Sequence, residues 1–142
     1  MKGWIAAALI VVPLLIAATI AYWPAKPIEV TSVVIAPPDV HGRSDISDLA
    51  EEVPALLAKQ LRELPRLKVR IAEKNLGPND AAAFDAVIIT TLTEDAGIVQ
   101  VNVQVVNPRT RTEIWNNAFQ SPRQQFRDMM RVAGDSVRRA LN

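Results

Sequence analysis

The sequence of 142 residues contains no cysteine, one histidine and only five glycines, and each shortage excludes a class of function. Without cysteine the protein has no disulfide, no metal–thiolate site and no lipid-modified amino-terminal cysteine. The single histidine, His41, leaves little material for acid–base or metal chemistry. The glycines are scattered among turns, so the chain lacks the glycine-rich loops that bind phosphate groups.

The charge balance gives no reason to expect a nucleic acid partner. The chain carries 16 Lys and Arg against 15 Asp and Glu, and its net charge is +1. Lys2 and Lys26 precede the part that can form a globular domain, which leaves that part nearly neutral. Domains that bind nucleic acid through phosphate contacts are usually clearly basic.

An uncharged apolar run extends from Ile5 to Tyr22. These 18 residues would span about 27 Å as a helix, close to the thickness of a bilayer core. Trp4 and Trp23 bracket the run as interfacial aromatic residues do, and Lys2 favours a cytoplasmic amino terminus. The sequence therefore predicts a single pass through the inner (cytoplasmic) membrane. The predicted parts are a cytoplasmic start at 1–4, a transmembrane signal-anchor helix at 5–23, a linker at 24–27 and a periplasmic domain at 28–142.

The same segment also fits a cleaved signal peptide. Thr19-Ile20-Ala21 is an acceptable small-x-small cleavage site after a weakly basic start. The run is longer than most signal-peptide cores, and the bulky Tyr22 and Trp23 follow the site directly, which favours retention. Both alternatives export the domain, as an anchored protein or as a secreted periplasmic assembly or transport factor.

The first half of the domain predicts a strand, a helix and a second strand. Residues 30–36 are rich in β-branched side chains, as in a strand buried on both faces, and a polar loop follows. Leucines and valines at intervals of three and four predict a helix that starts at about 48–51, has Pro54 near its first turn and stops at Pro65. Residues 67–72 alternate between apolar and polar side chains, the pattern of a half-exposed strand.

The second half predicts a meander of three strands and a closing helix. In the middle strand the valines at 99, 101, 103 and 105 alternate with polar residues, so one face is packed and the other is wet. Ser121 is expected to cap the last helix, with Pro122 at its first position. The predicted elements are a helical turn at 80–84, strands at 85–93, 98–106 and 111–119, and the closing helix.

The order of elements defines the predicted fold class as α/β (α+β). A strand–helix–strand unit places two parallel strands side by side, and the meander adds antiparallel neighbours. We therefore expect a two-layer domain with a mixed sheet of about five strands and helices mainly on one face, preceded by one amino-terminal transmembrane helix.

Several stretches of the domain follow a recognisable pattern. They are SVVIAPP from Ser32, LLAKQLRELPRLKV ending at Val69, FDAVIITTL from Phe84, VQVNVQVVNPRTRTEIW ending at Trp115, and the closing amphipathic helix. Through them the segment from Ser32 to Leu141 resembles the TolB amino-terminal-domain-like family, small α/β domains of envelope proteins that also accompany adenylate-cyclase domains and tetratricopeptide repeats. The resemblance implies a protein-interaction module without defined catalytic residues or cofactors.

Three positions depart from the family pattern. Glu51-Glu52 stands where the family has Asp-Gly at the first helix, Thr90 replaces a glycine in the third strand, and Arg111 replaces a glycine before the strand that contains Trp115. Because such glycines serve backbone geometry, their loss concerns local turns more than the fold.

Candidate catalytic residues have simpler explanations. His41 is expected in a polar loop as a solvated side chain. Asp48, Glu51 and Glu52 sit where a helix begins, and the helix dipole accounts for acidic residues there. We therefore expect no enzyme activity, no catalytic residue, no metal site and no cofactor.

An arginine stripe on the closing helix is the first candidate binding surface. Arg123, Arg127 and Arg131 recur at intervals of four, and Asp128 and Asp135 can pair with stripe residues or neighbouring arginines at i,i+3 or i,i+4. The stripe is either an ordinary solvated face or a patch for anionic lipid headgroups or an acidic partner.

Two other features are candidates for a partner-binding site. Glu51 and Glu52 lie beside the start of the first helix, where they could contact a protein. Trp115 is either a core residue of the last strand or an exposed anchor for a partner. The expected partners are the membrane and an envelope protein, and the sequence leaves the oligomeric state open.

Overall fold

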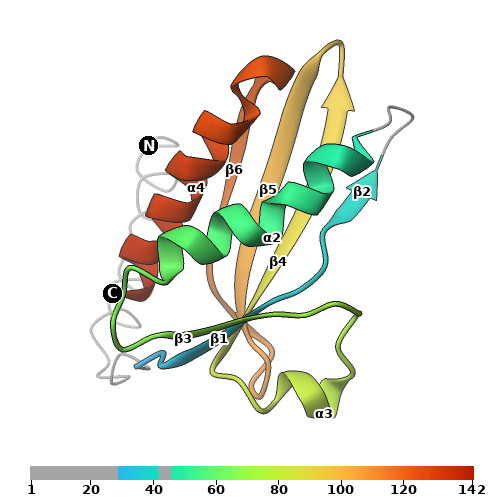
Figure 1. Ribbon diagram of the computed structural model, residues 1–142. Helices are drawn as coiled ribbons and strands as arrows, with labels where there is room; N and C mark the ends of the chain where they lie inside the picture. The colour runs from blue at the N-terminus through green and yellow to red at the C-terminus, as the bar shows by residue number, and fades with distance from the viewer. Residues whose placement is uncertain (1–28, 42–45) are drawn as a thin grey trace, which may run out of the picture.

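The computed structural model describes residues 29–41 and 46–142 (Figure 1). The predicted cytoplasmic start, the anchor helix at 5–23 and the linker at 24–27 lie outside the described residues. In the two described ranges, no helix combines the length and the apolar character that crossing a membrane requires.

A mixed sheet of six strands forms the centre of the domain. Five strands lie in the order β3-β1-β4-β5-β6, and β2 pairs with β4 off this path. β1 is parallel to both β3 and β4, whereas β4, β5 and β6 form the predicted antiparallel meander. The strands are β1 (Ser32–Ile35), β2 (Asp39–His41), β3 (Lys68–Ile71), β4 (Ala86–Asp95), β5 (Ile98–Asn107) and β6 (Thr112–Pro122). The predicted α/β class and mixed sheet are confirmed.

The strand β2 was not predicted. Pro37-Pro38 separates β1 from the next strand, because proline has no N–H to donate to a sheet ladder. The chain then resumes pairing with β4, with Asp39 opposite Thr91 and His41 opposite Thr93. The prediction of a loop at His41 was therefore wrong. All three residues of β2 are exposed, so this short strand lacks the apolar alternation that marks a strand in the sequence.

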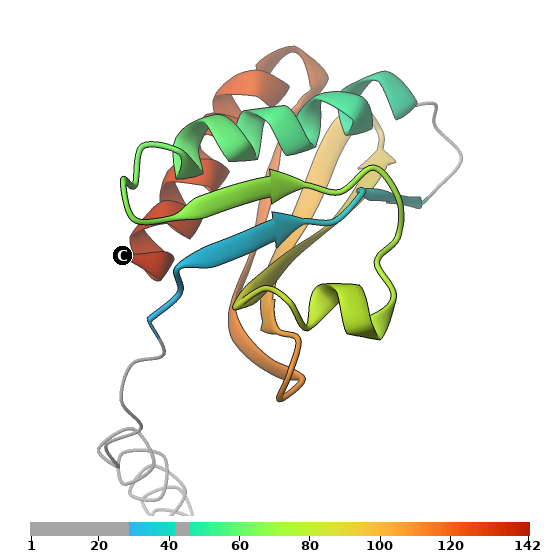
Figure 2. The same ribbon diagram turned by 60° about the horizontal axis from the view of Figure 1, so that its bottom comes forward.

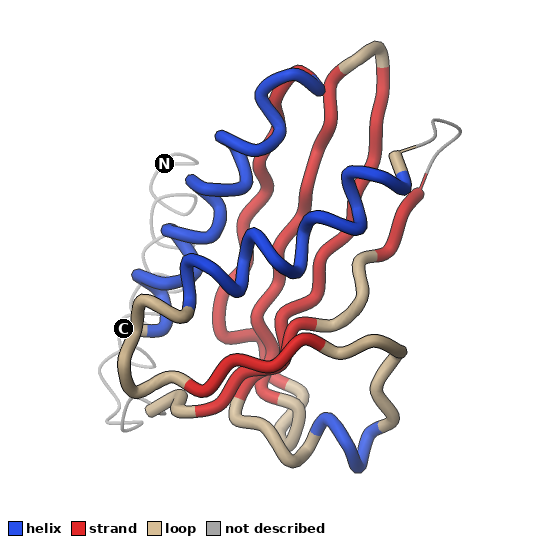
Figure 3. Tube along the Cα trace, in the orientation of Figure 1, coloured by secondary structure: helices blue, strands red, loops and turns tan. Residues whose placement is uncertain are grey.

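Two helices cover one face of the sheet, and a short helix lies on the other side of the fold. α2 (Ser47–Leu61) and α4 (Phe126–Leu141) lie next to each other over the strands (Figure 2). α3 (Pro78–Ala81) lies well apart from them (Figure 3). Near it, Val34 is completely buried and lines a hollow together with Leu76 and Phe84. The expected arrangement, with helices mainly on one face, is confirmed.

The closing helix begins later than predicted. Ser121 and Pro122 are the last residues of β6, where they pair with Val99 and Ile98, and a 3-10 turn (η1, Arg123–Gln125) precedes α4. Ser121 does not cap the helix, since its hydroxyl donates to the Pro122 carbonyl at 3.0 Å. The ladder to β5 extends through the capping motif, so tertiary pairing overrides the local propensity.

The bounds of α2 and α3 also differ from the prediction. α2 begins at Ser47, and the N–H of Ala50 donates to the carbonyl of Ile46 at 2.9 Å. Pro54 consequently lies inside the helix, past its first turn, and offers no N–H to the carbonyl of Ala50. α3 begins at Pro78, two residues before the predicted start, in the first helical position that suits proline.

The core lies between the sheet and the two long helices. The alternation predicted for β5 is confirmed, because the valines at 99, 101, 103 and 105 are buried while Gln100 and Asn102 are exposed. Phe126, Met130, Ala133 and Val137 form the buried stripe of α4. Other fully buried residues of the core are Val33, Ile35, Ile46, Val53, Leu57, Leu61, Ile88 and Leu92.

Thr90 places a polar group in this core. It is completely buried, and its hydroxyl has no hydrogen-bond partner in the described part of the chain. A buried hydroxyl without a partner costs about 1 to 3 kcal/mol. We expect Thr90→Val to raise the free energy of unfolding by about 1 kcal/mol in urea denaturation of residues 28–142. Thr91→Val, at a half-buried position, should have a smaller effect. An unchanged or lower midpoint for Thr90→Val would show that the hydroxyl is satisfied.

Candidate partner-binding site

The helices α2 and α4 run side by side in the same direction, so residues 75 positions apart in the sequence meet (Figure 1). Acidic side chains on α2 and just after it pair with arginines on or just before α4. The pairs are Arg123 with Asp48 at 3.1 Å, Arg127 with Glu52 at 2.8 Å, and Arg138 with Glu63. The constant separation in sequence shows that the helices keep one register over their length.

Two of the three residues in the arginine stripe take part in these interhelical pairs. Arg123 also reaches Glu94, at the end of β4, at 3.4 Å. Arg131 pairs within its own helix, with Asp128 at 3.7 Å, and remains 70% exposed. The prediction that Asp128 and Asp135 supply partners within the helix is confirmed, since Asp135 pairs with Arg138 and Arg139.

Glu52 and Arg127 form the most specific of these contacts. Arg127 donates from Nη2 and Nε to the two carboxylate oxygens of Glu52, at 2.8 and 3.3 Å. This bidentate hydrogen bond holds the pKa of the Glu52 carboxyl below its ordinary value and raises the pKa of Arg127. The Arg127 side chain is still 77% exposed, and Glu51, which precedes Glu52 in the sequence, is exposed as well. Arg123, Arg127 and Glu52 thus contribute to one row of charged pairs between the two helices, and Glu51 and Arg131 are exposed on these helices.

Asp85 lies where β1 and β4 begin, and no motif in the sequence marks it as a site residue. Its Oδ2 accepts hydrogen bonds from the N–H and hydroxyl of Thr31, at 3.0 and 2.9 Å, and from the N–H of Ser32 at 3.2 Å. Arg109, in the β5–β6 turn, lies 3.6 Å from Oδ1. The hydrogen bonds from Thr31, followed by the one from Ser32, hold the pKa of Asp85 below its ordinary value. Asp85 therefore ties the starts of β1 and β4 to the turn.

Removal of this carboxylate should destabilise the domain in a pH-dependent way. The stabilisation is complete above 3.8, the ordinary pKa of the group, and is lost as the pH falls through the lower pKa of the folded state. We expect Asp85→Ala to lower the free energy of unfolding by about 1 to 2 kcal/mol at pH 7. The difference from the wild type should shrink below about pH 4. Urea denaturation at several pH values tests this, with exposed Glu73→Ala as the control. A difference that is independent of pH would contradict the assigned role.

Among the residues considered for catalysis, Asp48 and Glu52 lie close enough for their charges to interact, but each of them is hydrogen-bonded to an arginine. His41 is exposed on β2, whereas Asp48 is engaged with Arg123 at the start of α2. Within residues 29–41 and 46–142 there is no cluster of His, Asp and Glu side chains that could hold a metal ion. Trp115 is partly buried on β6 and packs against the core, with its ring centroid 6.5 Å from that of Phe119.

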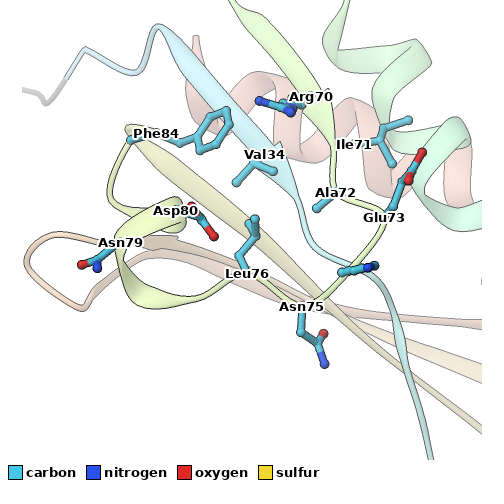
Figure 4. A pocket seen from close by; sticks show the side chains of 12 residues that line it. Val34, Arg70, Ile71, Ala72, Glu73, Asn75, Leu76, Asn79, Asp80 and Phe84 are labelled. Carbon is cyan, nitrogen blue, oxygen red and sulfur yellow. The ribbon is translucent and has the colours of Figure 1, made fainter.

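A hollow of about 850 Å³ lies between β1, β3 and the segment that contains α3. Val34, Leu76 and Phe84 point toward one another on its wall, and Arg70 and Asp80 lie at its margins (Figure 4). Its lining mixes apolar and charged side chains that come from different elements. None of them forms the nucleophile–base pair that covalent catalysis needs.

Comparisons with known proteins identify the fold. No protein-family model matches the sequence, and no curated protein matches it. Among solved structures, a PelC dodecamer from Paraburkholderia phytofirmans has a TM-score of 0.61 at 13% identity, over 80% of this chain and 88% of PelC. Lipoprotein GNA1162 from Neisseria meningitidis has a TM-score of 0.54 at 19% identity, over 65% of this chain and 80% of the lipoprotein.

TolB from Acinetobacter baumannii matches with a TM-score of 0.56 at 16% identity. The match covers 80% of this chain and 28% of TolB, so the chain corresponds to a small part of that protein. The resemblance to the TolB amino-terminal-like fold is thereby confirmed. At these identities the likeness concerns the fold alone.

Proposed function

We propose that the chain is a membrane-anchored, non-catalytic interaction module that docks an envelope protein in the periplasm. The observation that carries the proposal is the fold, which is shared along most of its length with a lipoprotein and with a protein that assembles as a dodecamer. The matched fold makes up 88% of the PelC chain and 80% of the lipoprotein chain, so neither of these chains contains a large additional domain. The apolar run before the domain supplies the anchor in this chain.

The fold has two ends that matter for an anchored protein. The proximal end is where the chain enters the domain at Glu29, next to Leu64 and Leu141 at the carboxyl ends of α2 and α4. The distal end comprises the amino ends of both helices and the hairpin between β4 and β5 (Figure 1). α4 has 16 residues, so the two ends of this helix lie about 24 Å apart. An anchor at the proximal end leaves the distal end free for a partner.

The proposed docking surface lies at and near this distal end. It contains Glu51, Glu52, Arg123 and Arg127 at the amino ends of the helices, and Arg131 one turn further along α4. The bidentate pair of Glu52 and Arg127 fixes both charges in place, so a partner meets a preformed pattern of acidic and basic groups.

Charge reversal across the arginine stripe tests this surface. We expect the combined Arg123→Glu, Arg127→Glu and Arg131→Glu protein to lose capture of its envelope partner in crosslinked membranes by at least tenfold. The domain should remain folded, because most of the pairs involved are exposed and contribute about 0 to 1 kcal/mol each. The pair with Glu94, which is 13% exposed, is the exception.

A matched control reverses three basic residues elsewhere, in Arg70→Glu, Lys74→Glu and Arg111→Glu. Quantitative mass spectrometry of the crosslinked material reads out the partner in both variants. Equal capture by the stripe variant and the wild type would remove the arginine stripe from the proposed site.

A further inference from the structure

The charges of the domain are divided between its two ends. The proximal end has more basic than acidic side chains, and the distal end has the opposite balance. Proximal residues are Lys59, Arg62, Arg66, Lys68, Arg109, Arg138 and Arg139 against Glu29, Glu63, Asp85 and Asp135. Distal residues are Asp39, Asp48, Glu51, Glu52, Glu94 and Asp95 against Arg123 and Arg127. The nearly neutral total charge of the chain conceals this polarity.

Three of the proximal cations are available to an external partner. Arg62 and Lys68 are exposed and make no ion pair with the described residues. Arg66 lies 4.0 Å from Glu29, but the two side chains are 90% and 75% exposed, so this pair is weak. Among the other acidic residues of this end, Glu63 and Asp135 are already engaged by arginines of α4. Asp85 accepts hydrogen bonds from Thr31 and Ser32 and lies 3.6 Å from Arg109.

The same end also exposes apolar surface. A hollow of about 340 Å³ lies between the start of β1 and the carboxyl ends of the two helices. Val30, Leu64, Pro65 and Leu141 contribute to its lining, and Arg66 stands beside them. Basic side chains around an apolar depression suit the boundary between headgroups and acyl chains.

The covalent chain keeps this end close to the apolar run. Six residues lie between Tyr22 and Glu29, and an extended chain covers at most about 25 Å over that distance. If the run from Ile5 to Tyr22 spans a bilayer, the proximal end cannot move far from the headgroups.

We propose that the proximal end of the domain rests on anionic lipid headgroups, which Arg62, Arg66 and Lys68 contact directly. The inference rests on the proposed anchor and adds the orientation of the domain. Each basic residue near an anionic surface strengthens the contact by about fivefold. The same surface repels the acidic distal end. The domain therefore stands with its docking surface turned away from the membrane.

The lack of cysteine allows a direct test with the full chain. A fluorophore is attached to Ala140→Cys at the proximal end or to Gln124→Cys at the distal end, each the single thiol of its protein. The labelled chains are placed in nanodiscs of phosphatidylcholine, alone or mixed equally with phosphatidylglycerol, that contain a lipid with a spin-labelled headgroup. We expect quenching at position 140 to exceed that at 124 at least threefold, to increase with phosphatidylglycerol and to fall with added salt.

The combined Arg62→Gln, Arg66→Gln and Lys68→Gln protein should lose the increase caused by phosphatidylglycerol. The matched control, with Arg70→Gln, Lys74→Gln and Arg111→Gln, should keep it. Circular dichroism checks that both variants are folded, and the salt titration of the wild type remains decisive if they are not.

Two results would overturn the inference in different ways. Quenching at position 140 that is indifferent to both phosphatidylglycerol and salt would mean that the proximal end does not contact the headgroups, although the anchor stands. A chain that fails to co-elute with the nanodiscs would overturn the anchored module itself, and the membrane-facing end with it.

Discussion

Phe126→Ala should lower the free energy of unfolding of residues 28–142 by about 3 to 5 kcal/mol, the usual cost of truncating a buried aromatic side chain. Phe126 is 1% exposed and opens α4 directly after the η1 turn, where it joins the core. Its loss leaves a cavity at the point where the helix docks on the sheet. Urea denaturation measures the change, and a loss of this size would leave a small domain close to unfolding.

The matched control for this prediction is Arg131→Ala on the same helix. Arg131 is 70% exposed, and among the described residues it pairs only with its helical neighbour Asp128 at 3.7 Å, so its removal should cost less than about 0.5 kcal/mol. Small and equal effects of Phe126→Ala and Arg131→Ala would mean that α4 is not packed on the sheet.

Gly134→Leu should also be strongly destabilising, by about 3 kcal/mol, because α2 and α4 approach each other closely at this residue. A Cβ atom at position 134 would lie 2.7 Å from Cγ and 2.9 Å from Cβ of Gln60. These atoms are near the backbone of α2, so the helices must move apart to admit a larger side chain. Alanine at this position gains helix propensity and should cost less than leucine.

Thermal or urea unfolding of Gly134→Leu, with Gly134→Ala beside it, tests the contact between the helices. Gln60→Ala in the leucine variant removes Cγ and should restore part of the lost stability. Full stability of Gly134→Leu alone would show that α2 and α4 are not in close contact at this position.

Elements with a strong apolar pattern could be predicted from the sequence, and elements defined by tertiary pairing could not. The alternating valines predicted the strand β5, and the apolar residues at helical spacing predicted the helix α4. β2 exists because the long strand β4 offers a free edge next to it, which no local pattern reveals. Ser121 carries a capping signal that the ladder to β5 overrides.

Arg111 shows how a departure from a family pattern can still preserve a turn. The family pattern has glycine before the strand that contains Trp115, and Arg111 in this position adopts a φ of 58°, in the left-handed region that favours glycine. The turn survives because the neighbouring hydrogen bonds hold it. The N–H of Arg111 donates to the carbonyl of Asn107 at 2.8 Å, and the side chain of Asn107 accepts from Arg109 and Thr110.

The candidate site was only partly predictable for a geometric reason. The spacing of four residues between Arg123 and Arg127 was visible, and so was the same spacing between Asp48 and Glu52. Their pairing depends on α2 and α4 being parallel and in register, which follows from the sheet topology. Asp48 and Glu52, interpreted from the sequence through the helix dipole, have Arg123 of η1 and Arg127 of α4 as their partners.

The intact mass of the protein isolated from cell membranes is the most direct test of whether the domain works while it is tethered to the membrane. We expect a protein whose mass still includes residues 1–21 and that remains with the membrane fraction after a high-salt wash. A shorter protein that begins near Tyr22 and is recovered in the soluble periplasmic fraction would contradict it. That result would favour the secreted assembly or transport factor.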